Sequence, residues 1–165
     1  MLTVGNKVVY PSQGPCLISS IVKTTVDERQ ITFYQLLVLT DSGGQLLVPV
    51  DKAKSIGIRR LLKKPEIPIL LDQLKRRSKG STDRKQRASE NLKLIKSGSA
   101  FDLAEIVKSL TRLIETKELS MGERGTLDRA KRLLVCEISE VTGDTREEAE
   151  EKVDRALRSR RRSES

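Results

Sequence analysis

Histidine and tryptophan are missing from this sequence of 165 residues, which also has only two tyrosines and two phenylalanines. Without histidine, general acid–base catalysis loses its commonest side chain. The glycine-rich motifs G-x-x-x-x-G-K-S/T and G-x-G-x-x-G, which bind phosphates and dinucleotides, are missing as well. Asp72, Asp83 and Glu90 are candidate catalytic acids, but the pattern favours solvated surface groups. We therefore expect that the protein is not an enzyme and takes no cofactor or small-molecule substrate.

Cysteines and long apolar runs are also scarce. Cys16 and Cys136 are far apart and lack the spacing of metal ligands, so we expect two buried free thiols and no metal site. No apolar run approaches the roughly 18 residues of a transmembrane helix. The stretch MLTVGNKVVY lacks the basic and apolar regions of a signal peptide. Together these absences predict a cytoplasmic protein with no membrane partner.

Positive charge is concentrated in one part of the chain, whose net charge is +9. Residues 1–50 carry three basic and three acidic groups, and residues 88–165 carry sixteen of each. Residues 51–87 carry thirteen basic and four acidic groups, which accounts for the whole excess. A local positive field of this kind attracts polyanions and speeds their encounter with the protein.

The densest basic stretch, KRRSKGSTDRKQR, runs from Lys75 to Arg87. It has three interpretations: cations that complement a helix C-terminus, a basic nuclear-import signal, or contacts with nucleic-acid phosphates. The helix dipole explains only the first three cations, because the other four flank a predicted helix start, where positive charge is unfavourable. Phosphate contact is the simplest explanation for these four. The candidate phosphate-binding residues are Lys75, Arg76, Arg77, Lys79, Arg84, Lys85 and Arg87.

The first fifty residues show the pattern of short β-strands. Runs rich in β-branched and apolar residues are separated by turn sequences such as Asp27-Glu28 and DSGG. The predicted strands span residues 7–11, 15–26, 29–40 and 45–50. They indicate a small, strongly bent antiparallel sheet or barrel. Pro49 predicts that the last strand lies at an edge, because proline lacks the N–H that an inner strand needs.

An edge strand of this type has two interpretations. Its unpaired backbone groups and apolar residues could accept a strand from a partner protein. Alternatively, it closes the sheet or packs against the helices that follow. The sequence pattern favours neither.

Helical patterns begin after about residue 51. Pro65 and Pro68 fit the first turn of a helix that runs to about residue 78, and a second helix is predicted over 83–96. The predicted N-caps of three further helices are Ser99, Ser120 and Thr145, the last two in S/T-x-x-E capping boxes. We predict an α+β fold with a β module over 1–52 and a helical domain over 53–165, of which 158–165 form a disordered tail.

Six segments of the chain, taken in order, show a resemblance to known proteins. In the N-terminal part they are VGNKVVYPSQG (4–14), LVPV (47–50) and SIGIRR (55–60). In the C-terminal part they are ENLKLIKSG (90–98), AEIVKSL (104–110) and LSMGERGTLDRAKRLLVCEI (119–138). With this order and spacing they resemble the CarD family of bacterial transcription regulators, including the CdnL group, over nearly the whole chain.

The resemblance implies different partners for the two halves. The N-terminal half would be a Tudor-like β module that binds the RNA polymerase β subunit through its last strand, at Gln45, Leu46, Leu47 and Val48. The helical half would contact promoter DNA, mainly its backbone, at the upstream edge of the melted bubble. The resemblance thus implies a nucleoid-associated transcription regulator that modulates the stability of the open promoter complex.

The sequence departs from the family pattern at three positions. The family usually has a tryptophan seven residues before the Asn of an Asn-Leu pair, which is Asn91-Leu92 here, so Arg84 takes its place. Ser89 stands where lysine is common, and Leu47 stands where arginine is common. The resemblance therefore implies a divergent paralogue in which Arg84 contacts a phosphate or probes a narrow minor groove. Further DNA-binding candidates, with a solvated helix face as the alternative, are Arg124, Arg129 and Arg132.

Two other functions fit the same sequence. The protein could be an adaptor that docks on polymerase or another partner and does not use DNA. It could also be an architectural DNA-binding protein that does not use polymerase. A steep salt dependence of DNA affinity would exclude the adaptor, and capture by the polymerase β subunit would exclude the architectural protein.

Overall fold

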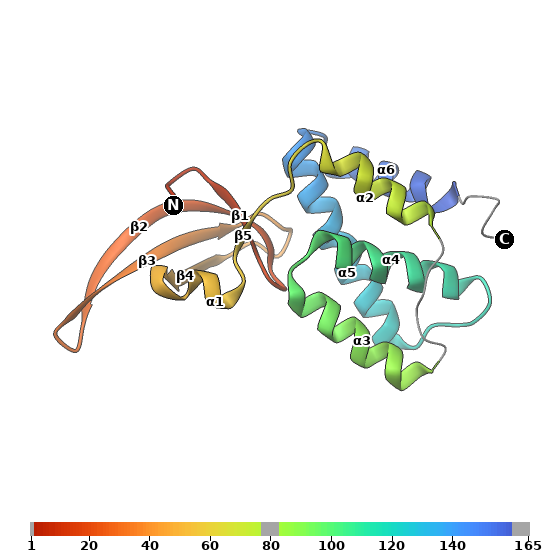
Figure 1. The fold of residues 1–165 in the computed structure, drawn as a ribbon, viewed down its shortest axis with the longest axis horizontal. Coiled ribbons are helices and arrows are strands. Elements are labelled where there is room, and N and C mark those ends of the chain that lie inside the picture. The colour runs from red at the N-terminus through yellow and green to blue at the C-terminus, as the bar shows by residue number, and fades with distance from the viewer. Residues whose placement is uncertain (1, 77–82, 160–165) are drawn as a thin grey trace.

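The computed structural model describes residues 2–76 and 83–159 and has a sheet at one end and a helical bundle at the other (Figure 1). The strands precede the long helices along the chain. The prediction of an α+β fold, an antiparallel β module followed by a helical bundle, is confirmed. Across the described ranges, no helix combines the length and apolar character needed to cross a bilayer.

In the part of the chain that the structure describes, the sheet has five antiparallel strands in the order β4-β3-β2-β1-β5. They are β1 (Lys7–Tyr10), β2 (Gly14–Val26), β3 (Arg29–Val38), β4 (Gln45–Pro49) and β5 (Arg59–Arg60). The four strands predicted from the sequence are confirmed to within two residues, and β4 lies at an edge, as Pro49 predicts. The sequence does not reveal β5, because two residues are too few to show alternation.

The connection after β4 packs on the sheet rather than on the bundle. A 3-10 helix (Val50–Lys52) and α1 (Ala53–Ile56) follow β4, and Ala53 is buried in the apolar core of the sheet. β5 then pairs with β1. We propose that the β module extends to about residue 60, beyond the predicted boundary at 52, because these residues bury their apolar atoms against the strands.

β2 and β3 form an arm that projects beyond the other strands and curves away from the helices (Figure 1). β2 and β3 pair with each other as far as Val26 and Arg29 at the tip. β4 pairs with β3 only as far as Phe33, so the arm beyond Phe33 consists of β2 and β3. Both turn residues, Asp27 and Glu28, have positive φ values of 49° and 64°. A two-residue turn with two positive φ values matches the right-handed twist of a hairpin. The hairpin predicted at Asp27-Glu28 is confirmed.

Within the described residues, five long helices form the bundle. They are α2 (Glu66–Lys75), α3 (Arg84–Ser97), α4 (Ala100–Ile114), α5 (Met121–Thr142) and α6 (Arg146–Arg158). The predicted N-caps Ser99, Ser120 and Thr145 are confirmed, and the last two form complete capping boxes. Residues 77–78 of the first predicted helix and residues 160–165 of the predicted tail lie outside the described ranges, and Arg158 still belongs to α6.

The apolar stripe of α5 holds the bundle together. Leu134 and Ile138 are fully buried in one core with Leu110 of α4, Leu70 of α2 and Val153 of α6. Side chains spaced three or four residues apart along a helix lie on one face, so a 22-residue helix can contact several partners at once. α5 therefore packs directly on α3, α4 and α6.

The ion pair between Arg59 and Glu137 joins the β module to the bundle. Arg59 of β5 donates two hydrogen bonds of 2.8 Å to the two carboxylate oxygens of Glu137 on α5. Glu137 is 1% exposed and also accepts a 2.9 Å hydrogen bond from the backbone N–H of Leu62. Arg59 Nε donates to the carbonyl oxygen of Gly98 at 2.8 Å. This cluster ties β5, the turn between α3 and α4, and α5 to one another.

A second polar cluster joins α5 to the strands through Glu140. Its carboxylate pairs with Lys7 of β1 at 2.8 Å and with Arg146 of α6 at 2.9 Å. Arg146 also donates to the carbonyl oxygen of Leu39 at 3.1 Å. Burial alone would raise the pKa of Glu140, but hydrogen bonds from Lys7 and Arg146 outweigh it and hold the pKa below its usual value.

Both cysteines are free and buried, as the sequence predicts. Burial raises the pKa of Cys16 to about 11, and it raises that of Cys136 to about 11 as well. Thiols with such pKa values stay protonated at neutral pH and are poor nucleophiles. Both side chains therefore act as small apolar groups.

Gly14→Ala is expected to disturb the contact between β2 and α5 and to lower the free energy of unfolding by about 2–3 kcal/mol, which urea denaturation measures. Gly14 has a φ of +89°, and a Cβ there would lie 2.8 Å from Leu133 Cδ2. Gly143 is the matched control, because its φ is +83° but nothing lies within 4 Å of an added Cβ. Gly143→Ala should cost only about 1 kcal/mol. Equal losses would show that the close approach to Leu133 is unimportant.

Candidate nucleic-acid interface and protein-docking edge

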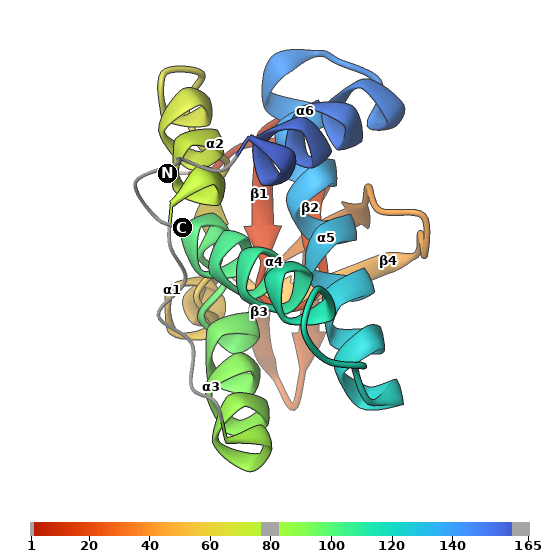
Figure 2. The same cartoon turned by 90° about the vertical axis from the view of Figure 1, so that its right-hand side faces the viewer.

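Several helices begin or end on the side of the bundle that faces away from the sheet, here called the distal end. The C-terminal ends of α2 and α4 and the N-terminal ends of α3 and α5 all lie there (Figure 1). Figure 2 looks onto this end, with the N-terminal ends of α3 and α5 on the same side of the bundle. Two helix N-termini point partial positive charge in one direction, which favours anions.

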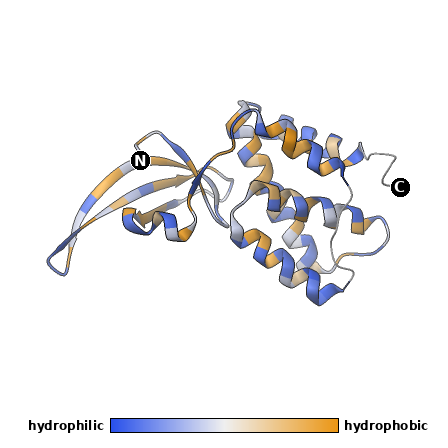
Figure 3. Ribbon diagram, viewed as in Figure 1, coloured by the Kyte–Doolittle hydropathy of each residue, from blue (hydrophilic) through white to orange (hydrophobic). Residues whose placement is uncertain are grey.

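Of the eight predicted DNA-binding residues that the structure describes, five occupy the distal end: Lys75, Arg76, Arg84, Lys85 and Arg124. Lys75 and Arg76 end α2, Arg84 and Lys85 begin α3, and Arg124 lies in the first turns of α5. The Arg84 side chain is 67% exposed, and Lys85 is also exposed. Figure 3 shows α3 as hydrophilic toward this end. Arg77 and Lys79 lie outside the described residues.

Acidic neighbours partly compensate three of these cations. Arg76 pairs with Asp72 at 2.9 Å, and Arg124 pairs with Glu118 at 3.4 Å. Arg84 Nε lies 3.9 Å from Glu123 Oε1, which is a loose contact. The Arg76–Asp72 and Arg124–Glu118 pairs are exposed and therefore weak, about 0–1 kcal/mol each, so a phosphate can replace these carboxylates at small cost.

Arg87 does not fit its predicted role as a phosphate contact. Arg87 is 8% exposed, and its guanidinium pairs with Glu123 of α5 at 3.1 Å. A buried cation paired in this way joins α3 to α5 and is not accessible to a phosphate. The sequence predicted that both residues contact phosphates, because Arg84 and Arg87 lie three residues apart on one face of α3. In the structure Arg84 is exposed, whereas Arg87, one turn later, packs against α5.

Glu123 connects α3 and α5 at the distal end. Its carboxylate caps α5 by accepting from the backbone N–H of Ser120, and it also binds Arg87. Burial alone would raise the pKa of Glu123, but the hydrogen bonds from Arg87 and from the Ser120 backbone outweigh it, so the pKa lies below its usual value. The S-x-x-E motif predicts the cap, whereas the pairing with Arg87 depends on how two helices pack.

We expect the stability of the protein to fall as the pH drops below about 4.5, the ordinary pKa of glutamate. Because the pKa of Glu123 is depressed in the folded state, its contribution is complete above the unfolded value and is lost as the pH falls through the folded value. Urea midpoints measured across this range would show the loss. Glu123→Gln should flatten the pH dependence, whereas Glu118→Gln, at a side chain 86% exposed, should not. Parallel curves for wild type and Glu123→Gln would contradict this prediction.

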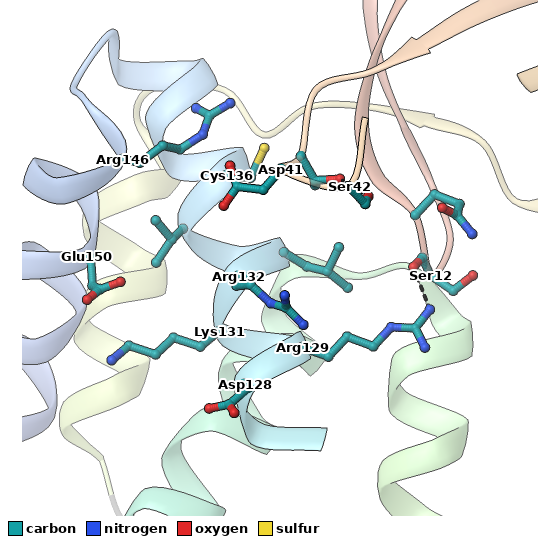
Figure 4. Close-up of a pocket in the computed structure, with 14 residues that line it drawn as sticks. Ser12, Asp41, Ser42, Asp128, Arg129, Lys131, Arg132, Cys136, Arg146 and Glu150 are labelled. Atoms are coloured by element: carbon teal, nitrogen blue, oxygen red, sulfur yellow. Dashed lines mark hydrogen bonds between the residues drawn. The ribbon is translucent and has the colours of Figure 1, made fainter. Parts of the chain in front are cut away.

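Arg129 and Arg132 lie away from the distal end, in a cleft of about 760 Å³ between α5, α6 and the loops of the β module. Figure 4 shows both side chains extending toward the loop that carries Ser12. Arg129 donates a 2.7 Å hydrogen bond to the carbonyl oxygen of Ser12. The cleft also contains acids, among them Asp41, and so it is not a uniformly basic surface. These two DNA-binding candidates stay untested predictions.

The predicted docking strand β4 presents one face outward and one inward. Leu47 is 62% exposed, whereas Val48 is 2% exposed and lies opposite Tyr34 in the sheet core. Gln45 is exposed, and Leu46 is half-buried. Among the described strands, β4 pairs only with β3, so its other edge keeps unpaired backbone groups. Leu47 and Gln45 can therefore contact a partner by side chain, and Leu46 and Val48 chiefly by backbone.

Apolar side chains of the arm lie on the same face of the sheet as Leu47. The register of the strands places seven apolar residues on the face of the sheet opposite its core: Leu17, Val22, Val26, Ile31, Phe33, Leu37 and Leu47. We call this set the outer face. Four of its members, Val22, Val26, Leu37 and Leu47, are between 37% and 62% exposed. Ser20, Gln35 and Gln45 lie on the same face and are linked by hydrogen bonds, so the outer face combines exposed apolar side chains with a polar row, as interaction sites often do.

Two family models match the chain: the CarD-like/TRCF RID domain over residues 2–62 and the CarD C-terminal domain over residues 70–154. The Bacillus subtilis (strain 168) protein named "Putative transcription factor YdeB" is 30% identical over 150 residues, which cover 88% of this chain and 95% of that protein. The solution NMR structure of the 72-residue N-terminal domain of Myxococcus xanthus CarD is 37% identical, covers 36% of this chain and 79% of that chain, and has a TM-score of 0.31. Because the family models match both the β module and the bundle, this protein is a transcription regulator that belongs to the CarD family.

Proposed function

We propose that this protein docks on the RNA polymerase β subunit through β4, binds promoter DNA through the distal end, and thereby shifts the equilibrium between closed and open promoter complexes. The observation that carries the proposal is the separation of two different surfaces on one molecule. The apolar edge and outer face belong to the sheet, and the exposed cations belong to the opposite end of the bundle (Figure 1).

Backbone pairing at β4 supports the protein half of the proposal. An exposed strand edge can accept a strand from a partner, with affinity from the backbone and specificity from alternate side chains. A strand of five residues is small beside the roughly 800 Å² that each partner buries in a stable interface. The adjoining outer face offers additional apolar area, so we expect the partner to cover both.

The exposed cations support the DNA half of the proposal. Arg84, Lys85 and Arg124 lie at helix N-termini, where cations oppose the dipole and bring no local stability. A phosphate nearby would reverse this effect, because it is attracted by both the side chains and the helix ends. We expect these residues to contact the DNA backbone, which sets position and affinity rather than base sequence.

A fixed connection between the two surfaces allows binding to affect promoter opening. The Arg59–Glu137 and Glu140 clusters hold the modules together, so a protein docked on polymerase presents its distal end to a defined stretch of DNA. The equilibrium shifts only if that DNA is bound better in the open complex than in the closed one. A difference of about 1.4 kcal/mol changes the ratio of the two complexes tenfold.

A promoter-opening assay with purified RNA polymerase tests the proposal. We expect the protein to change the lifetime of the open complex, and Leu47→Glu to remove this effect and weaken capture by the β subunit at least about tenfold, because a charge would enter an apolar interface. Ile69→Glu is the control, since Ile69 is 58% exposed on α2, away from β4. An unchanged open complex with wild type would overturn the proposed function, and equal effects of the two substitutions would exclude β4 as the dock.

A further inference from the structure

The cleft of about 760 Å³ that contains Arg129 and Arg132 has walls from both modules. The β module contributes Ser12 and Gln13 from the turn between β1 and β2, and residues 40–42 from the loop between β3 and β4. α5 and α6 form the other walls (Figure 4). Sites for small molecules are typically clefts of about 300–1,000 Å³ and often lie between domains. The size and the position of this cleft therefore suit a small ligand.

Two guanidinium groups of the cleft are available to an anion. Among the residues that the structure describes, neither Arg129 nor Arg132 forms an ion pair with a carboxylate, whereas Lys131 pairs with Asp154 of α6 at 2.7 Å. Arg129 and Arg132 are three residues apart and share a face of α5. Figure 4 shows both extending toward the loop of Ser12, while Lys131 extends the opposite way. Because a guanidinium group binds phosphate oxygens in a bidentate manner, this pair suits two linked phosphates.

The turn that faces these guanidinium groups has an unusual backbone. Ser12 has a φ of 70°, in the left-handed region that is unfavourable for residues other than glycine. This conformation places its carbonyl oxygen 2.7 Å from the Arg129 guanidinium, which donates to it. The backbone N–H of Gln13 donates to Tyr10 at 3.0 Å and closes the turn. Strained residues of this kind cluster at ligand sites, and here the strain holds one of the two cations in the cleft.

Acidic groups give the two ends of the cleft opposite charge. Asp41 lies beside Cys136, whereas the two guanidinium groups lie toward Ser12 (Figure 4). Asp128 and Glu150 also line the cleft, but Asp128 extends away from the loop of Ser12 and Glu150 belongs to α6. A phosphate is therefore attracted to the guanidinium end and repelled from Asp41. An amino group is favoured at Asp41, because a carboxylate only accepts hydrogen bonds.

We infer that the cleft binds a nucleoside diphosphate, with its phosphates on Arg129 and Arg132 and its base directed toward Asp41. The base would contact three buried apolar residues that line the cleft: Leu133, Val135 and Cys136. The ligand is bound and not converted. Because it would contact both modules, it would strengthen the connection between them. This inference does not depend on the DNA and polymerase contacts proposed above.

Isothermal titration of the full-length protein with GDP, pyrophosphate and guanosine tests the site. GDP should bind, and the two fragments should each bind at least about tenfold more weakly, because each lacks one set of hydrogen bonds to charged groups. Replacing Arg129 and Arg132 by alanine should lower GDP affinity at least about tenfold. The matched control, Lys23→Ala with Arg29→Ala, removes the same charge from the arm and should keep the wild-type affinity.

A second comparison tests the orientation of the base. UDP should bind more weakly than GDP, because the N–H of uracil lies between two carbonyl groups that a carboxylate repels, whereas guanine presents an N–H and an amino group together. Asp41→Asn should reduce this difference. If Asp41→Asn left the difference unchanged, the base would not be directed toward Asp41 and the inferred orientation would be wrong.

Nuclear magnetic resonance of the ¹⁵N-labelled wild type locates the ligand without any substitution. GDP should shift the backbone signals of residues 12–14 and 40–42 and leave those at the start of α3 unchanged. The inference is wrong if GDP does not bind, if it shifts the start of α3 instead, or if both double variants weaken it equally. Equal affinities for GDP and pyrophosphate would also overturn it, because the cleft would then recognise phosphate alone.

Discussion

Glu137→Ala is expected to destabilise the protein by about 3 kcal/mol, because it removes one partner of a buried ion pair. For a chain of this size this corresponds to a fall in melting temperature of about 6–12 °C. The substitution would leave the Arg59 guanidinium, only 28% exposed, without its carboxylate. It would also leave the backbone N–H of Leu62 without its acceptor. Thermal denaturation followed by circular dichroism measures the effect.

Two further variants check that explanation. Arg59→Lys keeps the charge but cannot make both parallel hydrogen bonds, so an intermediate loss is expected. Arg124→Ala removes a pair between side chains that are 62% and 86% exposed, and it should change the stability by less than about 1 kcal/mol. If Glu137→Ala were no more harmful than Arg124→Ala, the connection between sheet and bundle would not depend on this ion pair.

Replacing Arg84, Lys85 and Arg124 together by alanine is expected to lower DNA affinity by about a hundredfold or more at roughly 100 mM salt. Each phosphate contact releases counterions, so the slope of log affinity against log salt concentration should flatten by about 2–3 for the three contacts. Titrations of a labelled duplex at several salt concentrations give both quantities. Because these side chains are exposed, the variant should keep the melting temperature of wild type to within a few degrees.

The control removes cations elsewhere. Lys23→Ala with Arg29→Ala takes two exposed positive charges from the arm of the sheet, far along the molecule from the distal end (Figure 1). This variant should keep the wild-type slope. If the triple variant also kept the wild-type slope, the protein would act as an adaptor that does not use DNA. If both variants lost slope in proportion to charge, overall charge rather than the distal end would determine affinity.

The two predictions address different links between structure and function. Loss of the Arg59–Glu137 pair should loosen the connection between the modules and leave the distal cations intact. Loss of the distal cations should weaken DNA binding and leave the connection intact. We would therefore measure Glu137→Gln both in the DNA titration and in the promoter-opening assay. The first reports DNA affinity, and the second also depends on how the bound DNA is positioned relative to polymerase.

Much of the secondary structure follows from local sequence. Pro49 cannot donate to a neighbouring strand, so β4 had to lie at an edge, and the Asp27-Glu28 turn predicted the hairpin. The capping boxes at Ser120 and Thr145 fix where α5 and α6 begin, because they satisfy backbone N–H groups within four residues. These features depend on neighbours along the chain, so the sequence can reveal them.

Contacts between residues far apart in the sequence explain where the structure differs from the sequence-based predictions. β5 exists because Arg59 and Arg60 meet β1, some fifty residues earlier in the chain. The sequence analysis did not single out Glu137, which is buried on α5 and pairs with Arg59, 78 residues away in the sequence. Arg87 looked like a free cation, yet the packing of α3 on α5 pairs it with Glu123.

The sequence by itself determined the α+β layout, the edge position of β4, the helix starts and the concentration of positive charge in residues 51–87. Only the tertiary structure decided which cations share a surface: it gathered Arg84, Lys85 and Arg124 at one end, buried Arg87, and placed Arg129 and Arg132 in a separate cleft. The physical reason is that strand alternation, caps and turns are set within a few residues. The exposure of a charge depends instead on which distant segment packs against it.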